Sequence, residues 1–552
     1  MPFSSWKSYL RPHHSPEAPA WVRLLIAAAS GALLSFSFRG SFPEVFGWFC
    51  LALLFSSVLR ARARVAFGCG FLHGLLFVVT CVPWIADVLA VHGGMSVAAG
   101  WGVLLLIAVV WGASIGLATW VIQRLSLRSL SLALLGAPFL WISTEVLRAY
   151  LPEISFPWGL LGYVPSKNPA LLQLAALTGV FGLSFLAAAF NSLLLWSDCG
   201  DGPGKRQRLS VLAAVIAVLL LVAWLGPRFV PHAEAHHLAR VVQPNFPENV
   251  RYEGDWYADH KDDLFVLREL SLAPTPGMHP LGKPNPVPTN RIAIAPSGGS
   301  DLLIWPEAPA PFSFQDPHFG PYISELATDF GHPVIVGVIE WKPGQEFING
   351  AMRNMLLPYN SAAMLNAFGQ KTFGYDKIHL VPFGEYEPFP FIHQVVTSVS
   401  EEVGGFHKGK ERTVGKFPNG NTFSVFICYE AIYPAEVRDF TDRGAQLLIN
   451  ISNDGWFGTS EAAEQHLRMA RVRAVENRRW LVRDTNSGIT ASIDPYGNVT
   501  RVMSRDARDS ADLPYDFRTD KTPYTRFGDW FILLCGALTL LLAGKGIHRL
   551  HR

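Results

Sequence analysis

Three side chains with the chemistry for acyl transfer stand beside apolar runs of the sequence. Glu307 follows LLIWP, Lys377 precedes IHLVPFG, and Cys428 follows TFSVFI. A thiol becomes a competent nucleophile when a base takes its proton, and a carboxylate serves as that base where burial raises its pKa towards neutrality. A fixed ammonium and a backbone N–H, here that of Tyr429, stabilise the oxyanion of the intermediate. Glu, Lys and Cys therefore form a complete set for acyl transfer.

Cys428 is the only one of the six cysteines that lies in the long polar region of the chain. No disulfide can therefore form within that region, and a lone thiol there indicates a reactive group. The alternative is an inert core thiol, because free cysteine is among the most buried residue types. The sequence has neither a CxxC nor an HExxH motif, so we expect neither a metal nor another cofactor.

The elements that must position these side chains alternate between strand-like and helical patterns over residues 238–525. Residues 422–427 are rich in Phe, Val and Ile, which is typical of a buried strand, and Pro434 predicts a helix start. Other strand-like runs are ARVVQPN, DLLIWPE, HPVIVGVIEW, NMLLPYN, AQLLINIS, RWLVRDT and ITASID, and helical patterns include YISELATDF and EAAEQHLRMARVRAVENR. Strands interleaved with helices predict an α/β layered domain, and the Pro- and Gly-rich residues 273–300 predict a long loop within it.

The rest of the chain is strongly apolar. Of the 552 residues, 50% are hydrophobic and only 16% are charged, which is typical of a membrane protein. Apolar runs near the ~20 residues that cross a bilayer lie at about 21–38, 42–59, 65–90, 95–123, 130–150, 169–196, 208–226 and 529–544. We therefore predict eight transmembrane helices: a seven-helix domain over 21–226 and a last span over 529–544. Residues 1–20 and 545–552 would be terminal segments.

Basic residues mark every second loop between these runs. They are Lys7, Arg11, Arg60, Arg62, Arg64, Arg124, Arg128, Lys205, Arg206, Arg208, Lys545, Arg549 and Arg552. Because basic short loops stay in the cytoplasm, both termini are predicted to be cytoplasmic and the 238–525 domain to lie outside. In the fifth run, Glu145 and Arg148 are spaced to pair on one helix face, and we expect an ion pair at the membrane interface. The net charge of +2 gives no reason to expect nucleic acid as a partner.

The three islands WPE, YDKIHLVPFGE and CYE resemble the Glu-Lys-Cys signature of the nitrilase, or carbon–nitrogen hydrolase, superfamily. With FPWGLLGY in the apolar part, NDGWFG at 453–458 and EQHLRMARVRAVENRRWLVRDTNSGITA at 464–491, nearly the whole chain resembles the bacterial apolipoprotein N-acyltransferase family. The resemblance implies a nitrilase-like αββα sandwich joined to a helical membrane domain. It also implies a bacterial inner-membrane protein with its catalytic domain on the periplasmic side.

The same resemblance assigns roles to the matching positions. Glu307 matches the general base, Lys377 the oxyanion-stabilising lysine and Cys428 the nucleophile that carries a thioester. Supporting residues that match the family are Glu385, Tyr429 and Glu430; Tyr252 in QPNFPENVRY is a partial match, because members often have a tryptophan there. The implied reaction moves a fatty acyl group from a membrane phospholipid to the α-amino group of the diacylglyceryl-modified N-terminal cysteine of an apolipoprotein. The 273–300 loop is longer than the family pattern suggests.

Three other functions fit part of the sequence. A membrane-anchored amidase with the same triad would hydrolyse a small amide, but it leaves eight spans unexplained. A thiol enzyme that pairs Cys428 with His379 or His466 and Asn453 explains Glu307 and Lys377 less well. A transporter with an extracytoplasmic sensor domain is disfavoured because few charges lie within the predicted spans.

Overall fold

The computed structural model describes residues 18–40, 44–151, 155–247, 256–273, 299–309, 312–348, 351–386 and 405–547. The chain forms two compact units. Unit 1 comprises Met1–Asp87, Ser96–Val230 and Phe527–Arg552, and unit 2 comprises Val88–Met95 and Pro231–Arg526. The strands and helices expected over 238–525 fall within unit 2.

Six helices in the described part of unit 1 are long and apolar enough to cross a membrane. They are α2 with the turn that follows (Ala20–Phe38), α4 (Ala63–Cys81), α6 (Val97–Ser126), α7 (Leu130–Tyr150), α10 (Val180–Cys199) and α11 with its turn (Lys205–Phe229). Shorter apolar helices are α3 (Cys50–Val58), α8 (Pro169–Leu172), α9 (Ala175–Thr178) and α17 (Trp530–Ile547). Two of the eight predicted spans, at 42–59 and 529–544, correspond to shorter helices, so the count of eight stays a prediction.

One local expectation about the apolar runs is wrong, and another is confirmed only as a pairing. The run at 65–90 is not one helix, because α4 ends at Cys81 and Pro83, which has no backbone N–H, separates it from α5 (Trp84–Val91). Arg148 Nη2 lies 3.5 Å from Glu145 Oε1, but the two residues are only 3% and 0% exposed. The predicted ion pair therefore forms, between side chains buried in the helix bundle; its position at the membrane interface stays a prediction.

The described residues of unit 2 form two six-stranded sheets. The first has the order β12-β1-β2-β3-β4-β5 and the second the order β11-β10-β9-β8-β7-β6. The strands of the first sheet are β1 (His237–Gln243), β2 (Leu302–Ile304), β3 (Val334–Ile348), β4 (Ala351–Leu365), β5 (Lys371–Asp376) and β12 (Asp509–Tyr515). Those of the second are β6 (Gly415–Lys416), β7 (Thr422–Ile427), β8 (Leu447–Ser452), β9 (Trp480–Thr485), β10 (Ala491–Ile493) and β11 (Val499–Val502).

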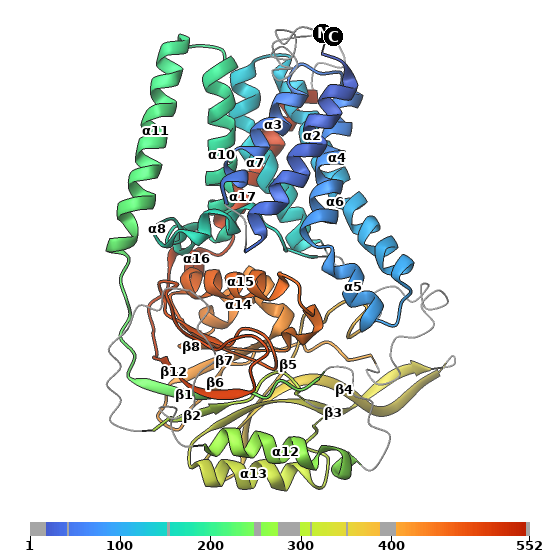
Figure 1. Cartoon of the computed structure of the whole chain (residues 1–552), viewed down its shortest axis with the longest axis vertical. Helices are drawn as coiled ribbons and strands as arrows, with labels where there is room; N and C mark the ends of the chain where they lie inside the picture. Colours follow the sequence, from blue (N-terminus) through green and yellow to red (C-terminus); the bar gives the residue numbers. More distant parts are fainter. Residues whose placement is uncertain are drawn as a thin grey trace. The chain divides into compact units, whose positions relative to one another are not determined.

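The two sheets pack face to face between two helical layers (Figure 1). Helices α12 (Trp256–Leu272) and α13 (Phe319–Phe330) cover the first sheet, and α14 (Pro434–Asp442) and α15 (Ala462–Asn477) cover the second. Side chains alternate along the strands, so Ile304 lies in the core between the sheets while Leu303 packs with the α12–α13 layer. The result is the αββα sandwich that the family resemblance implies.

Parallel strands in each sheet bring the ends of several strands to one place. β1, β2 and β3 are parallel neighbours in the first sheet, and β7, β8 and β9 are parallel neighbours in the second. Glu307 follows β2 by three residues, and Cys428 immediately follows β7. The carboxyl ends of parallel strands are where α/β folds gather their functional side chains.

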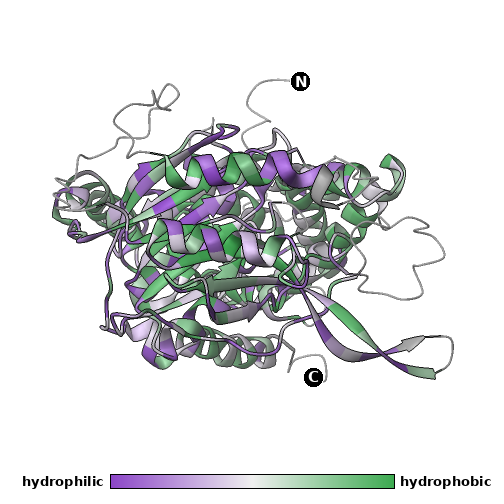
Figure 2. Cartoon of the chain, turned by 90° about the horizontal axis from the view of Figure 1, so that it is seen from below, coloured by the Kyte–Doolittle hydropathy of each residue, from purple (hydrophilic) through white to green (hydrophobic). Residues whose placement is uncertain are grey.

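The outer parts of β3 and β4 form a two-stranded ribbon that stands clear of the rest of unit 2 (Figure 2). This ribbon exposes Met352, Met355 and Leu356. Neither β2 nor β5 reaches it, because β2 pairs with β3 only at Val334 and Ile335, and β5 pairs with β4 from Ser361 onward.

Candidate active site

A buried lysine lies between two glutamates at the end of β5. Lys377 is 1% exposed, and its Nζ lies 2.8 Å from Glu307 Oε1 and 2.9 Å from Glu385 Oε1. Lys377 directly follows β5, and its backbone N–H donates to the Asn360 carbonyl at 2.8 Å. Glu307 and Glu385 are 78 positions apart in the sequence, and the fold brings both into contact with Lys377.

Asn360, on β4, completes this cluster and was not singled out by the sequence. Its Nδ2 donates to Glu307 Oε1 at 2.8 Å and to Glu385 Oε1 at 2.7 Å. The other two carboxylate oxygens accept from the main chain: Glu307 Oε2 from Asn453 N–H at 2.9 Å and Glu385 Oε2 from Val381 N–H at 2.8 Å. Both glutamates are thus held by donors on both oxygens, which is the arrangement that an ionised carboxylate requires.

The charge on Lys377 follows from its surroundings. Burial lowers the pKa of the ammonium, but the attraction of Glu307 and Glu385 outweighs it and leaves that pKa well above its usual range. An ammonium with this pKa does not release its proton near neutral pH. Lys377 therefore acts as a fixed positive charge and not as a proton acceptor.

Cys428 lies at the junction of β7 and the short helix η8 (Cys428–Ile432). Its thiol is almost inaccessible, since the residue is 7% exposed. Burial raises the pKa of this thiol, the charge of Glu307 raises it further, and Lys377 lowers it in part. The resting sulfur is therefore a neutral thiol that needs a base, and the charges of Glu307, Lys377 and Asp454 act on it.

Glu430 forms hydrogen bonds both to residues next to Lys377 and to the residue that precedes Cys428. Its Oε1 accepts from Tyr375 OH at 2.7 Å and from the backbone N–H groups of Ile378 and His379 at 2.7 and 3.1 Å. Its Oε2 accepts from Ile427 N–H at 2.7 Å. The carboxylate thus fixes the residues that flank Lys377 against the residue that precedes Cys428.

The remaining predicted supporting residues differ in what the structure says of them. The Tyr429 ring packs edge-to-face against Tyr433, with ring centroids 5.4 Å apart, and Tyr433 stacks on His379. Tyr429 therefore belongs to a buried aromatic group next to Cys428. Tyr252 lies outside the described residues, as does most of the 273–300 loop.

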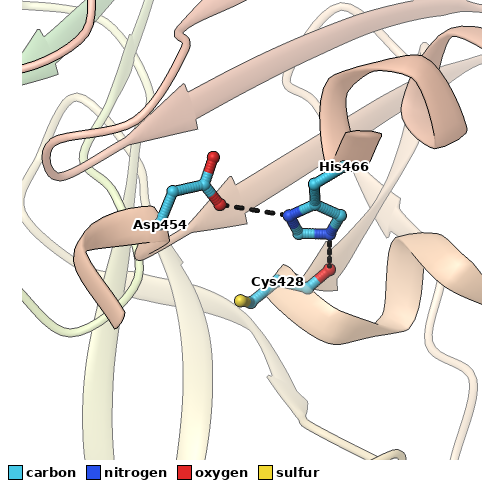
Figure 3. Close-up of side chains that lie close together, drawn as sticks. All are labelled: Cys428, Asp454 and His466. Atoms are coloured by element: carbon cyan, nitrogen blue, oxygen red, sulfur yellow. Dashed lines mark hydrogen bonds and ion pairs between the residues drawn. The ribbon is translucent and has the colours of Figure 1, made fainter. Parts of the chain in front are cut away.

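Among the described residues, neither histidine considered as a partner for the thiol makes a hydrogen bond to the Cys428 sulfur. Figure 3 shows the Cys428 sulfur directed away from the His466 ring, whose Nε2 lies 3.0 Å from the Cys428 carbonyl oxygen. His379 Nε2 instead faces Glu436 Oε2 at 3.2 Å. In this geometry neither histidine is placed to take the thiol proton, which disfavours the thiol–histidine alternative.

Cys428, Asp454 and His466 each offer a possible metal-ligand atom, and these atoms lie within 4.8 Å of one another. Arg483 Nη2 lies 2.7 Å from both Asp454 oxygens and 3.1 Å from His466 Nδ1. A guanidinium already occupies the place that a cation would take, so this donor set does not fit a metal ion.

Comparisons with known proteins cover both units. Residues 30–193 match the family model of the apolipoprotein N-acyltransferase N-terminal domain, and residues 252–512 match the carbon-nitrogen hydrolase model. An apolipoprotein N-acyltransferase of Geobacter metallireducens is 31% identical over 534 residues, 95% of each chain. One from Rhodopseudomonas palustris is 28% identical over 547 residues, also 95% of each chain.

Among solved structures, an amidase from Nesterenkonia sp. covers 54% of this chain and 98% of its own, at 17% identity and a TM-score of 0.33. That similarity is too low to say anything about activity.

Proposed function

The chain belongs to the apolipoprotein N-acyltransferase family, and we propose that Cys428 carries the transferred acyl group as a thioester between two half-reactions. The enzyme is an acyltransferase; the proposed donor is a membrane phospholipid. The proposed acceptor is the α-amino group of the diacylglyceryl-modified N-terminal cysteine of an apolipoprotein.

In the proposed first half-reaction, Glu307 takes the thiol proton as the Cys428 sulfur attacks the carbonyl carbon of the phospholipid ester. The Lys377 ammonium and the Tyr429 N–H stabilise the resulting oxyanion. The C–O bond then breaks, and the proton passes from Glu307 to the oxygen of the departing lysophospholipid. This leaves the acyl group on sulfur and Glu307 ready for a second cycle.

In the proposed second half-reaction, the nitrogen of the neutral acceptor amine attacks the thioester carbon. Glu307 takes a proton from that nitrogen, the C–S bond breaks, and the sulfur regains the proton as the amide forms. The Lys377 ammonium and the Tyr429 N–H also stabilise the oxyanion that forms in this half-reaction. The thiol is restored, so atoms and charges balance over the cycle.

The observation that supports this mechanism is the placement of the Lys377 ammonium. It is buried against Glu307 and Glu385 and also acts electrostatically on the Cys428 thiol. Because its pKa is raised, the charge persists through both half-reactions, as an oxyanion-stabilising group requires.

The protein is a bacterial membrane protein, as its relatives and the six long apolar helices among its described residues indicate. We further propose that unit 2 lies on the periplasmic side of the inner membrane and that both termini are cytoplasmic. The support comes from basic residues that gather in alternate connections of unit 1, including Arg60, Arg62, Arg64, Arg124 and Arg128. A chain tethered to the membrane at both ends of unit 2 avoids the cost of extracting lipid chains, on the order of 0.8 kcal/mol per CH₂.

The test is the intact mass of the detergent-purified protein after incubation with a phospholipid and no acceptor. We expect a gain of one fatty acyl group that neutral hydroxylamine removes. The gain should be absent in Cys428→Ser and at least about 10²-fold slower in Glu307→Gln, while Cys199→Ser, a buried cysteine of unit 1, should behave like wild type. A diacylglyceryl peptide added afterwards should remove the acyl group from the enzyme.

Two results would overturn the proposal. One is a folded wild-type protein that gains no acyl group in the presence of lipid. The other is an adduct that persists in Cys428→Ala, which has no nucleophile at position 428, since the acyl group would then be on another residue. Release of ammonia from a short-chain amide without any phospholipid adduct would instead favour the amidase.

A further inference from the structure

The backbone of Cys428 has an unusual conformation that another side chain holds in place. Its φ is +47°, in the left-handed region that residues with a Cβ rarely adopt. The Cys428 carbonyl oxygen accepts a hydrogen bond from His466 Nε2 at 3.0 Å (Figure 3). His466 lies on α15 and is fully buried.

The Cys428 carbonyl and the Tyr429 N–H belong to one peptide group. A trans peptide is planar, so its C=O and N–H point in opposite directions. A side chain that fixes the carbonyl therefore fixes the direction of the N–H as well. A hydrogen bond to the carbonyl also polarises the peptide and strengthens its N–H as a donor.

We propose that His466 is a positioning residue for the oxyanion: by holding the Cys428 carbonyl, it aims the Tyr429 N–H of the same peptide at the carbonyl oxygen of the acyl group on Cys428. The inference rests on the proposed function, because it presupposes acyl transfer through Cys428. It assigns to His466 a task different from that of a base, since the imidazole contacts the main chain and not the sulfur.

The residues behind His466 hold its ring in place. A carbonyl oxygen can only accept, so Nε2 of His466 must carry a proton. Nδ1 lies 3.1 Å from Asp454 Oδ1 (Figure 3). Arg483 Nη2 lies 3.1 Å from Nδ1 and 2.7 Å from both oxygens of Asp454. Burial and the Arg483 charge lower the pKa of His466, and together they outweigh Asp454 and the Cys428 carbonyl, which raise it.

Asp454 is in turn fixed by the strand ends and by a glycine. Ser452 Oγ, at the end of β8, donates to Asp454 Oδ1 at 2.9 Å. A Cβ at Gly488 would lie 2.3 Å from Asp454 Oδ2 and 2.6 Å from its Cγ. The series of contacts from Arg483 through Asp454 and His466 to the Cys428 peptide therefore has little room to shift.

The test compares two polar replacements of His466 in the full-length protein. Glutamine places an amide nitrogen where imidazole Nε2 lies, whereas asparagine is too short to reach the Cys428 carbonyl. Acylation by a p-nitrophenyl ester passes through an oxyanion. Alkylation of Cys428 by iodoacetamide is a displacement at a saturated carbon and forms none. Peptide mass spectrometry would assign the alkylated cysteine among the six in the chain.

We expect His466→Asn to lower the acylation rate about 10²-fold, in line with the loss of one oxyanion donor, with alkylation of Cys428 unchanged. His466→Gln should restore acylation to within roughly 10-fold of wild type. His260→Asn, at another fully buried histidine, on α12, should leave the ratio of acylation to alkylation at its wild-type value.

Two results would overturn the inference: equal acylation rates in wild type, His466→Asn and His466→Gln, or a parallel fall of acylation and alkylation in His466→Asn. If His466→Asn does not fold, Gly488→Ala, which presses on Asp454, should lower acylation and spare alkylation, and an unchanged ratio there counts against it. Failure of wild type to acylate at all would refute the proposed function instead.

Discussion

Asn360 offers the sharpest test of how the two glutamates are held. Its side-chain amide donates one hydrogen bond to Glu307 and one to Glu385, and both glutamates also bind Lys377. In Asn360→Ala both bonds are lost. In Asn360→Asp the shape is kept but the donor becomes an acceptor, so a third carboxylate faces two others around a single ammonium.

The magnitude can be worked from the partners that remain. A hydrogen bond to a charged group contributes about 1.5–3 kcal/mol, and Glu307 keeps two of its three partners, Lys377 and the Asn453 N–H. The loss of one such bond from the base corresponds to a rate about 10- to 100-fold lower for Asn360→Ala. Asn360→Asp adds repulsion between like charges in a buried site, so we expect it to be slower still and less stable by a further ~1–3 kcal/mol.

The assay is the rate of acyl-adduct formation on Cys428 in a single turnover, measured by intact mass, together with the melting temperature of each variant. Asn366→Asp, at an exposed turn after β4 whose side chain contacts Gln370, controls for the general effect of an Asn-to-Asp change. If Asn360→Asp were as fast and as stable as Asn360→Ala, or if either matched wild type, the amide would not be holding the two carboxylates and the reasoning would fail.

Two further predictions concern the surroundings of the site. Gly337 has no room for a side chain, because a Cβ there would lie 2.3–2.8 Å from backbone atoms of residues 306–308. Gly337→Ala should therefore displace Glu307, the proposed general base, slow adduct formation and lower the free energy of unfolding by about 1–3 kcal/mol. Gly405→Ala, with open space around it, should have none of these effects. Burial raises the pKa of Asp454, but the Arg483 charge outweighs burial, so the pKa lies below the ordinary 3.8. The stability that the ionised carboxylate provides is complete above pH 3.8 and is lost as the pH falls below that value. The melting temperature should therefore fall more steeply with acid in wild type than in Asp454→Asn.

Much of unit 2 was predictable because the composition of most of its strands is itself typical of buried strands. The runs that contain Leu302–Ile304 and Thr422–Ile427 are short, apolar and bounded by Trp–Pro or Cys–Tyr, and both are strands in the structure. β5, β6, β11 and β12 were not predicted; β5 and β12 show the reason. KTFGYD contains Gly and charged residues, and DSADLPY contains Pro, so neither shows strand-like composition; both are stabilised by pairing with β4 and β1.

Asn360 and Arg483 show what sequence alone does not provide. Both lie in runs that read correctly as strands, NMLLPYN and RWLVRDT, but a strand pattern gives only the face of the sheet, not the neighbours across it. Asn360 meets Glu307 across 53 positions and Arg483 meets Asp454 across 29. A buried polar residue in an otherwise apolar strand was the available signal, because such a residue must find a partner.

The burial of Cys428 connects the two halves of the proposed reaction. A thiol whose pKa is raised by burial ionises only when a base is placed against it, so we expect the resting enzyme to react slowly, though measurably, with unrelated electrophiles. In the proposed mechanism, the same burial keeps water from the thioester before the acceptor arrives. We expect an amine carried on a lipid-anchored substrate to enter such a buried site more readily than bulk water. The preference for amide formation over hydrolysis would then follow from where the thiol is buried, with no need for a residue dedicated to rejecting water.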